Sequence, residues 1–373
     1  MMSCGEPSGD LYAGALAVEI RRRDPAAAIF GLGGQRMMAG GGELLADYRG
    51  ISVTGLVEAL CVVPRSLVVM NRLIDAARSE KPHALVVIDF PDFNFRLAAA
   101  VKKLGIPVIY YISPQLWAWR RNRMQTMKRI ADRVLVIFPF EEALYRNAGV
   151  PVEFVGHPLV DLARAQEPKE SFLDEIGLSG SRPIVALLPG SRPNEVDRLL
   201  PVMRDAAAQI TRQLPDTQFV VARAPSLDDR LFSRVRWKGT KPIEVLARTD
   251  DVLAVADVAV TASGTATVQA ALHGRPMVVV YRLSPLTYRL GRRFVHVDTF
   301  AMVNLIAGRR IVPELIQDDC TPENVSREVL SLLTDAVRFE ATRAALRDVR
   351  QKLGAPGASG RAAEAVLAVA SKH

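Results

Sequence analysis

Apolar runs rich in β-forming residues alternate with amphipathic segments along the first half of the chain. The runs cover residues 28–32, 84–90, 108–112, 134–138 and 152–155. Helical patterns lie between some of them, such as residues 11–22 and 95–103. Strands that are apolar on both sides are typical of parallel sheets buried beneath helices. The pattern therefore predicts a parallel sheet covered by crossover helices.

The same alternation restarts in the second half of the chain. Its apolar runs cover residues 184–188, 218–222, 258–262 and 277–281. The stretch 161–182 is polar, with Pro and Gly in and just after it, which is typical of a connection between domains. A chain of 373 residues also exceeds the size at which one core usually keeps growing. We therefore expect an α/β protein of two doubly wound, Rossmann-like domains that face a cleft.

The expected domain boundaries follow from this alternation. The first domain comprises residues 1–165 and the second comprises residues 166–340. Two more helical segments follow, at residues 337–353 and 361–370. We expect these C-terminal helices, residues 341–373, to pack back on the first domain.

Composition restricts the location and the partners of the protein. The three cysteines are far apart and lack CxxC spacing, so we expect neither disulfides nor a zinc site, and a reducing cytoplasm fits best. We expect no signal peptide and no membrane-spanning helix. The formal net charge of +8 favours anionic partners, such as phosphorylated substrates or an acidic membrane surface. The basic residues are dispersed and lack a nucleic-acid-binding signature, so we expect no nucleic acid.

Two turns in the second half have the form of an anion site. Ligands of open α/β sheets bind beyond the carboxyl ends of the strands, where helix N-termini favour negative charge. The first turn, in "LLPGSR", follows the run 184–188 and offers an Arg side chain that can grip an oxyanion. The second, in "ASGTATVQAAL", offers a Gly that admits a phosphate and a neighbouring hydroxyl. The residues concerned are Gly190, Ser191, Arg192, Ser263, Gly264 and Thr265.

Structural interpretations of these residues remain open at this point. Helix capping is an ordinary role for Ser263 and Thr265, and Arg192 alone would be unremarkable in a surface turn. Gln269 lies four residues after Thr265 and shares its helix face. It can accept hydrogen bonds from ribose hydroxyls, although a solvated Gln is equally compatible with the pattern.

Polar turns in the first half suggest a second pocket. "GEPSGD" carries Glu6, Ser8 and Asp10, which form either an acceptor pocket or a helix cap. A strand should precede this turn, but "MMSC" supplies only four residues, so we expect that strand to be short or missing. "IDFPDFN" ends an apolar run at Asp89, whose carboxylate is well placed to act as a general base on an alcohol. Asn94 follows in the same motif.

Three further segments have two interpretations each. "SPQLWAWR" contains Trp117, Trp119 and Arg120, which suit a sugar or phosphate, or else form a core with a solvated Arg. His157, in "FVGHP", favours a structural role. Residues 56–73 are heavily apolar with basic residues among them, which suits either a core helix or a surface that enters lipid. No cluster has convincing metal-ligand spacing, so we expect no metal and no cofactor.

Taken together, these motifs resemble the lipid-A-disaccharide synthases, glycosyltransferases (family 19) of Gram-negative bacteria. The resemblance rests on "GEPSGD", "IDFPDFN", "SPQLWAWR", "FVGHPLVD", "LLPGSRPNEV", "ASGTATVQAAL" and "VNLIAGRRIVPELIQ", which span most of the chain. It implies a GT-B fold whose second domain binds the UDP-sugar donor and whose first domain binds the acceptor. It also implies transfer of 2,3-diacylglucosamine from UDP to the 6-hydroxyl of 2,3-diacylglucosamine 1-phosphate, with inversion, giving lipid A disaccharide 1-phosphate and UDP.

The resemblance implies roles for particular residues. Asp89 would be the base, and Arg192 with the turn 263–265 and Arg282 would stabilise the departing diphosphate. Asn304 and Arg309 belong to the donor side by the same resemblance, and Gln269 stands where the family usually has Glu. Glu6, Ser8, Asp10, Asn94, Trp117, Trp119 and Arg120 would face the acceptor.

The resemblance also implies a place in the cell. Because both substrates are amphiphiles, we expect peripheral attachment to the cytoplasmic, inner face of the inner membrane, through basic residues and the apolar segment 62–70. A homodimer is one expected assembly. The alternatives are a UDP-sugar epimerase or peptidoglycan-type glycosyltransferase of the same fold, or a non-catalytic nucleotide-sugar or lipid-binding protein.

Overall fold

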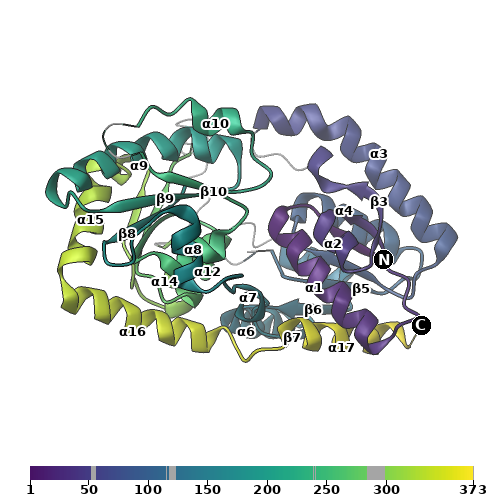
Figure 1. Ribbon diagram of the computed structural model, residues 1–373. Coiled ribbons are helices and arrows are strands. Elements are labelled where there is room, and N and C mark those ends of the chain that lie inside the picture. The colour runs from purple at the N-terminus through teal and green to yellow at the C-terminus, as the bar shows by residue number, and fades with distance from the viewer. Residues whose placement is uncertain are drawn as a thin grey trace. The chain divides into compact units, whose positions relative to one another are not determined.

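Two parallel β-sheets, one in each unit of the chain, organise the described residues (Figure 1). The computed structural model describes residues 1–51, 56–114, 116, 123–237, 239, 241–283 and 299–372, and for residues 56–62 it describes the backbone only. The first unit comprises Met1–Pro158 and Leu353–His373, and the second comprises Leu159–Lys352. The expected fold class, two parallel-sheet α/β domains, is confirmed.

The first unit contains a sheet with the strand order β3-β2-β1-β4-β5-β6-β7 within the described part of the chain. All of its neighbouring strands are parallel. Its strands are β1 (Met2–Cys4), β2 (Phe30–Gly33), β3 (Glu43–Asp47), β4 (Leu85–Ile88), β5 (Val108–Tyr111), β6 (Arg133–Val136) and β7 (Val152–Phe154). Its helices are α1 (Pro7–Arg23), α2 (Gln35–Ala39), α3 (Leu56–Glu80), α4 (Pro91–Lys102), α5 (Arg123–Ile130), α6 (Pro139–Asn147) and α17 (Ala358–Ala370).

The strand order of the first sheet reverses between β1 and β4, and this position is the first switch point. The chain runs outward from β1 to β3 and then returns to place β4 on the other side of β1. The strand expected to be short or missing is present with three residues and is buried between β2 and β4. A crevice for a ligand opens at such a reversal, beyond the carboxyl ends of the two strands.

The second unit has a sheet with the order β10-β9-β8-β11-β12-β13 among its described residues, again parallel throughout. The order reverses between β8 and β11, the second switch point. Its strands are β8 (Ile184–Leu188), β9 (Gln218–Arg223), β10 (Ile243–Leu246), β11 (Val258–Ala262), β12 (Met277–Tyr281) and β13 (Glu314–Ile316). Its helices are α7 (Leu159–Leu162), α8 (Lys169–Ile176), α9 (Pro193–Gln213), α10 (Asp229–Ser233), α11 (Thr249–Val255), α12 (Thr265–Leu272), α14 (Met302–Ala307), α15 (Pro322–Thr334) and α16 (Ala336–Lys352).

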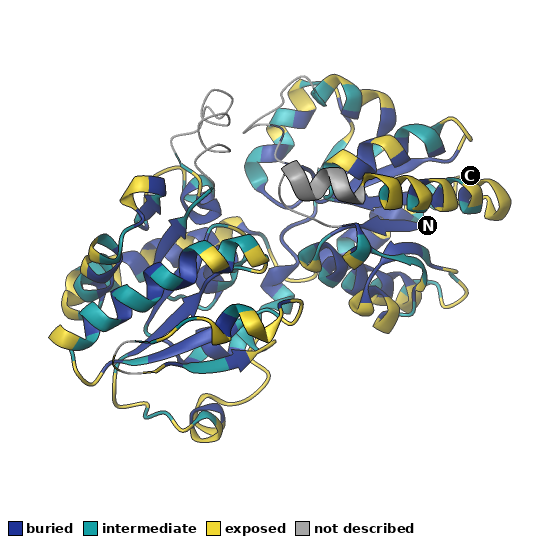
Figure 2. Ribbon diagram, turned by 90° about the horizontal axis from the view of Figure 1, so that it is seen from above, coloured by how far each residue is buried: buried dark blue, intermediate teal, exposed yellow. Residues whose placement is uncertain are grey.

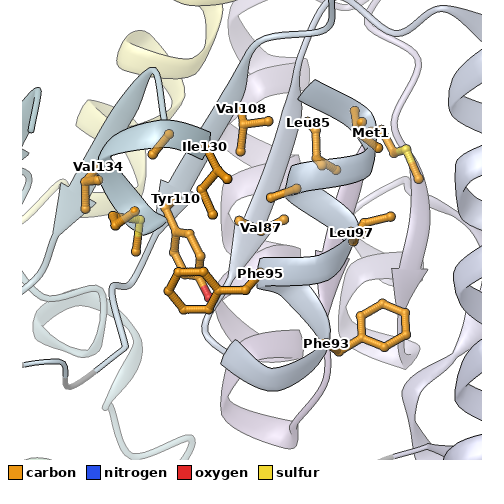
Figure 3. Close-up of a cluster of buried hydrophobic side chains, with 14 of the residues drawn as sticks. Met1, Leu85, Val87, Phe93, Phe95, Leu97, Val108, Tyr110, Ile130 and Val134 are labelled. Carbon is orange, nitrogen blue, oxygen red and sulfur yellow. The ribbon is translucent and has the colours of Figure 1, made fainter. Parts of the chain in front are cut away.

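Each sheet is the centre of its own hydrophobic core. Interior strands such as β4, β5, β8 and β11 are buried along their whole length, as their dark blue colour in Figure 2 shows. In the first unit, Leu85, Val87 and Val108 meet the inner side of α4, and the rings of Phe95 and Tyr110 lie 5.6 Å apart (Figure 3). In the second unit, the buried side of α9 packs beside α15. Because strand side chains lie in these cores, the strands are apolar in sequence, and apolar runs predict them.

The C-terminal helices divide between the two units. α16 packs on α12, α14 and α15 and so belongs to the second unit. α17 instead lies against α1 in the first unit (Figure 1). The units therefore change at Pro158/Leu159 and Lys352/Leu353, which differs from the expected boundaries after residues 165 and 340. The physical reason is that α7 packs on α12, and α16 covers helices of the second unit.

Candidate active site

The turn between β4 and α4 holds Asp89 at the first switch point. Asp89 and Phe90 both have left-handed backbone conformations, with φ of 44° and 48°. Such conformations cost energy for residues other than Gly and recur at functional sites. The Asp89 carbonyl accepts hydrogen bonds from Asn94 Nδ2 at 2.8 Å and from the Tyr110 hydroxyl at 3.0 Å. The surrounding side chains thus hold a strained turn that carries a partly exposed carboxylate.

Asn94 supports this turn from inside the protein. Its side chain is 0% exposed. Its Oδ1 accepts from Ser3 Oγ at 2.7 Å, and its Nδ2 also donates to the carbonyls of Ser3 and Ile88. Asn94 therefore joins the carboxyl ends of β1 and β4. This differs from the expected contact with the acceptor, because the buried amide is already engaged in the fold.

The turn after β1 lies beside the Asp89 turn. A Cβ added to Gly5 would come 2.1 Å from the ring of Phe90, so the Gly allows the two turns to pack together. Glu6 and Ser8 are partly exposed there. Asp10 is instead 3% exposed, and its carboxylate accepts from the backbone N–H groups of Gly34, Arg36 and Met37, at 2.7, 3.0 and 3.0 Å. Asp10 thus caps α2, so of these three expected acceptor residues only Glu6 and Ser8 are accessible.

His157 is a core residue of the first unit. Burial lowers its pKa to about 3, so the imidazole is neutral near pH 7. Its ring centroid lies 6.0 Å from that of Tyr12 and 5.4 Å from that of Phe138. These contacts fit the structural role favoured from the sequence. Trp117, Trp119 and Arg120, expected on the acceptor side, lie outside the described residues.

The turn after β8 presents Arg192 at the second switch point. Gly190 has φ of 117°, and a Cβ there would come 2.3 Å from Glu195 Oε2. The Glu195 carboxylate accepts from the backbone N–H of Ser191 at 3.1 Å and from Arg192 Nη1 at 3.2 Å. The Arg192 side chain is 37% exposed. Glu195 therefore orients the guanidinium while leaving part of it accessible to an anion.

The turn after β11 completes the second switch point. Gly264 precedes α12 with φ of 150°, and among the described residues it has no side-chain cap and no atom within 4 Å of an added Cβ. Ser263 Oγ donates to the carbonyl of Phe300 at 3.2 Å instead of capping the helix. The helix thus starts at an exposed Gly. An uncapped helix N-terminus with space beside it suits a phosphate.

Tyr281 brings the end of β12 to the same site. Burial raises the pKa of its phenol, and the negative charge of Glu195 raises it further while Arg192 opposes this effect. Arg282 follows and donates to the carbonyl of Cys320 at 2.8 Å. The carboxyl ends of β8, β11 and β12 therefore gather polar and cationic groups along one edge of the sheet.

Asn304 is a supporting residue in this structure. It is 1% exposed, and its Nδ2 donates to Glu314 Oε1 at 2.6 Å. Glu314 Oε2 accepts from the backbone N–H of Phe300 at 2.8 Å, and the Phe300 carbonyl accepts from Ser263. Asn304 thus reaches the donor turn through Glu314 and Phe300, because its own amide is buried. This differs from a direct donor contact.

Arg309 and Gln269 have surroundings that the sequence did not indicate. Arg309 lines a cavity of about 420 Å³ together with residues of α16, including Asp348 and Lys352. Gln269 Nε2 contacts the carboxylate of Asp250 at 3.2 and 3.3 Å.

No group of three His, Cys, Asp or Glu side chains that could hold a metal ion occurs among the described residues. None of the described helices is long and apolar enough to cross a membrane.

Sequence reasoning missed the residues that support the expected ones. Glu195 carried a signal, since it lies three residues after Arg192 at a helix start, where an acidic side chain commonly binds backbone N–H groups. The sequence contains no signal for the roles of Tyr110 and Asp250, because the residues they contact, Asp89 and Gln269, are distant in the chain.

Solved structures with a similar fold include epimerases and glycosyltransferases. A UDP-GlcNAc 2-epimerase from Neisseria meningitidis, bound to UDP-GlcNAc, matches with a TM-score of 0.71 at 12% identity, covering 98% of each chain. The calicheamicin glycosyltransferase CalG4 matches with a TM-score of 0.59 at 18% identity, covering 100% of this chain and 98% of that one. At such low identity these matches show the fold alone. The fold is that of the GT-B class, and these structural neighbours include both glycosyltransferases and UDP-sugar epimerases.

Comparison at the level of sequence identifies the family. The lipid-A-disaccharide synthetase model matches residues 1–369, and the chain belongs to this family. It is 45% identical to the lipid-A-disaccharide synthase of Myxococcus xanthus, covering 98% of this chain and 96% of that protein. It is 42% identical to the enzyme of the same name from Geobacter sulfurreducens, covering 100% and 97%. The chain is therefore a hexosyltransferase of lipid A disaccharide synthesis, and these matches do not favour the alternatives.

Proposed function

We propose that this chain condenses UDP-2,3-diacylglucosamine with 2,3-diacylglucosamine 1-phosphate, giving lipid A disaccharide 1-phosphate and UDP. The observation that supports it is the complementary chemistry of the two switch points. One carries a carboxylate on a strained turn, and the other carries a partly exposed Arg and a helix N-terminus that has no side-chain cap among the described residues. A base and an anion site are what an inverting transfer from a nucleoside diphosphate requires.

In the proposed reaction, the acceptor 6-hydroxyl oxygen attacks the anomeric carbon of the donor sugar. Asp89 accepts the hydroxyl proton as the new carbon–oxygen bond forms. The bond from the anomeric carbon to the diphosphate breaks, and its electron pair leaves with UDP. Arg192, the N-terminus of α12 and Arg282 stabilise the negative charge that grows on the leaving diphosphate. The mechanism requires both switch points to reach the same donor sugar.

Release of UDP from UDP-2,3-diacylglucosamine tests the proposed function. We expect purified protein to release UDP only when 2,3-diacylglucosamine 1-phosphate is present, with the disaccharide 1-phosphate as the second product by mass spectrometry. An epimerase would alter the sugar without the acceptor, and a binding protein would release nothing. Either result would contradict the proposal.

We place the protein on the inner face of the inner membrane through α3. Val63, Leu67 and Val68 on this helix are 45%, 51% and 67% exposed. Arg65 and Arg72 are exposed on the same helix. An apolar stripe with basic neighbours suits an anionic lipid surface, to which each basic residue contributes about 1 kcal/mol.

Flotation with vesicles tests this attachment. We expect the Leu67→Ser/Val68→Ser variant to bind phosphatidylglycerol-containing vesicles about tenfold or more weakly, because each buried aliphatic side chain contributes roughly 1.5–3 kcal/mol. Val337→Ser is the matched control, since Val337 is 82% exposed on α16 in the second unit. Binding that high salt weakens would reflect the basic residues. Equal flotation of the α3 variant and the control would contradict a role for this helix.

A further inference from the structure

Gln269 belongs to a cluster of three side chains in the second unit, together with Asp250 and His273. Asp250, in the first turn of α11, accepts from Gln269 Nε2 through both carboxylate oxygens, at 3.2 and 3.3 Å. His273 Nε2 lies 3.0 Å from Asp250 Oδ1. The side chains of Asp250 and His273 are 22% and 12% exposed. Gln269 and His273 are one helical turn apart on α12, so both reach the same carboxylate.

The chemistry of this cluster determines which way the Gln269 amide points. A carboxylate accepts hydrogen bonds and cannot donate them. The amide nitrogen must therefore face Asp250, and the amide oxygen, Oε1, is turned away from it. An amide that could otherwise rotate through both orientations is held as an acceptor. Gln269 lies one turn after Thr265, within the helix whose start forms the anion site.

The same contact makes a carboxylate unfavourable at position 269. A Glu there would place two negative oxygens at the distance now spanned by an N–H···O bond. Two carboxylates that share a site cannot both ionise without a penalty. Asp250 and an amide at position 269 are therefore a matched pair.

We propose that Asp250 and His273 are positioning residues that orient Gln269 as a neutral acceptor for the ribose hydroxyls of the UDP group, so that Asp250 makes Gln, rather than Glu, the functional side chain at this position. The inference rests on the proposed function, because it takes the second switch point to be the UDP-sugar site. It predicts an effect that would not be expected if Gln269 contacted the ribose without help from its neighbours. The effect of a charge at position 269 must depend on the charge at position 250.

Binding of UDP to four proteins tests this coupling by isothermal titration calorimetry. Relative to wild type, we expect Gln269→Glu to weaken UDP binding about tenfold or more. Asp250→Asn should weaken it about threefold, because the amide loses its fixed orientation. The double variant should bind within about threefold of wild type, since its two side chains can again share a hydrogen bond. Asp216→Asn, which removes an exposed carboxylate of the same unit before β9, is the control.

A second measurement separates orientation from general stability. Wild type should bind UDP more tightly than 2′-deoxyuridine diphosphate, and this preference should fall in Asp250→Asn while the control keeps it. Gln269→Glu binding UDP as tightly as wild type, or a double variant no tighter than Gln269→Glu, would overturn the inference.

The failure of the proposed donor site is distinguishable from the failure of this coupling. If wild type does not bind UDP, or if Arg192→Ala binds it unchanged, the second switch point is not the donor site and both proposals are wrong. If Arg192→Ala weakens UDP binding while the Asp250 and Gln269 variants act independently, only the inference is overturned.

Discussion

Replacing Asp89 with Asn is expected to lower the turnover number about 100-fold to 10,000-fold, the usual contribution of a general base. Asn is nearly isosteric with Asp and tolerates the left-handed backbone that Asp89 adopts, so the turn should keep its shape. Asp89→Ala would remove the same carboxylate, but Ala tolerates the left-handed backbone less well than Asn and would strain the turn. Affinity for UDP should be unchanged in Asp89→Asn, because the proposed nucleotide site lies in the second unit. Acceptor-dependent UDP release measures the turnover.

Asp92 provides a matched control for Asp89. It lies in the first turn of α4, its side chain is 69% exposed, and it pairs with Arg123 at 2.6 Å. A surface ion pair of this kind contributes roughly 0–1 kcal/mol. Asp92→Asn should therefore keep most of its activity and stability. Near-normal turnover by folded Asp89→Asn would exclude Asp89 as the base.

Replacing Arg192 with Ala is expected to lower the turnover number about 100-fold to 1,000-fold, the effect of losing one preorganised donor to a developing anion. UDP should also bind more weakly, since the leaving diphosphate uses the same side chain. Arg192→Lys should recover only part of the loss, because Lys lacks the planar pair of donors. The Gly190–Ser191 turn should persist, since Glu195 still accepts from the backbone of Ser191.

Arg212 is the control for this second prediction. It is exposed in the last turn of α9, at the opposite end of the helix that begins beside Arg192. Arg212→Ala removes one positive charge from the same element and should leave both UDP affinity and turnover near those of wild type. If Arg192→Ala behaved in the same way, the proposed stabilisation of the diphosphate would be wrong.

The strands that the sequence did not predict share one physical property. β3, β10 and β13 are edge strands of their sheets. They read ELLAD, IEVL and ELI, and several of their residues are partly exposed. An edge strand has a neighbour on one side and is less completely covered, so it needs no uninterrupted apolar run. Interior strands such as β8 and β11 are covered on both faces and therefore need an uninterrupted apolar run. Their predicted bounds match the observed ones.

Helix starts were predicted several residues late for a related reason. α1 begins at Pro7 and α4 begins at Pro91, each with Pro in the first turn. Pro is compatible with the first helical position because the N–H that it lacks would have no partner within the helix. The apolar periodicity used for prediction begins only after that turn.

The candidate site was predictable where polar residues follow apolar runs. The sequence predicts Asp89, Arg192 and Gly264 at strand ends in this way, and they follow β4, β8 and β11 in the structure. Whether a polar side chain at that edge faces a ligand or the protein is decided by burial, which motif spacing does not contain. Asn94 and Asp10 lie in the expected turns, yet both are buried and hydrogen-bonded within the fold.

The position of α17 has a consequence for how the first unit is completed during translation. The second unit is continuous in the chain and can fold once Lys352 has left the ribosome. The first unit must wait for α17, whose Glu364 binds Arg23 of α1 at 2.8 Å and whose buried residues include Ala362 and Val366. Until α17 has emerged, the side of α1 that it covers in the finished protein stays uncovered.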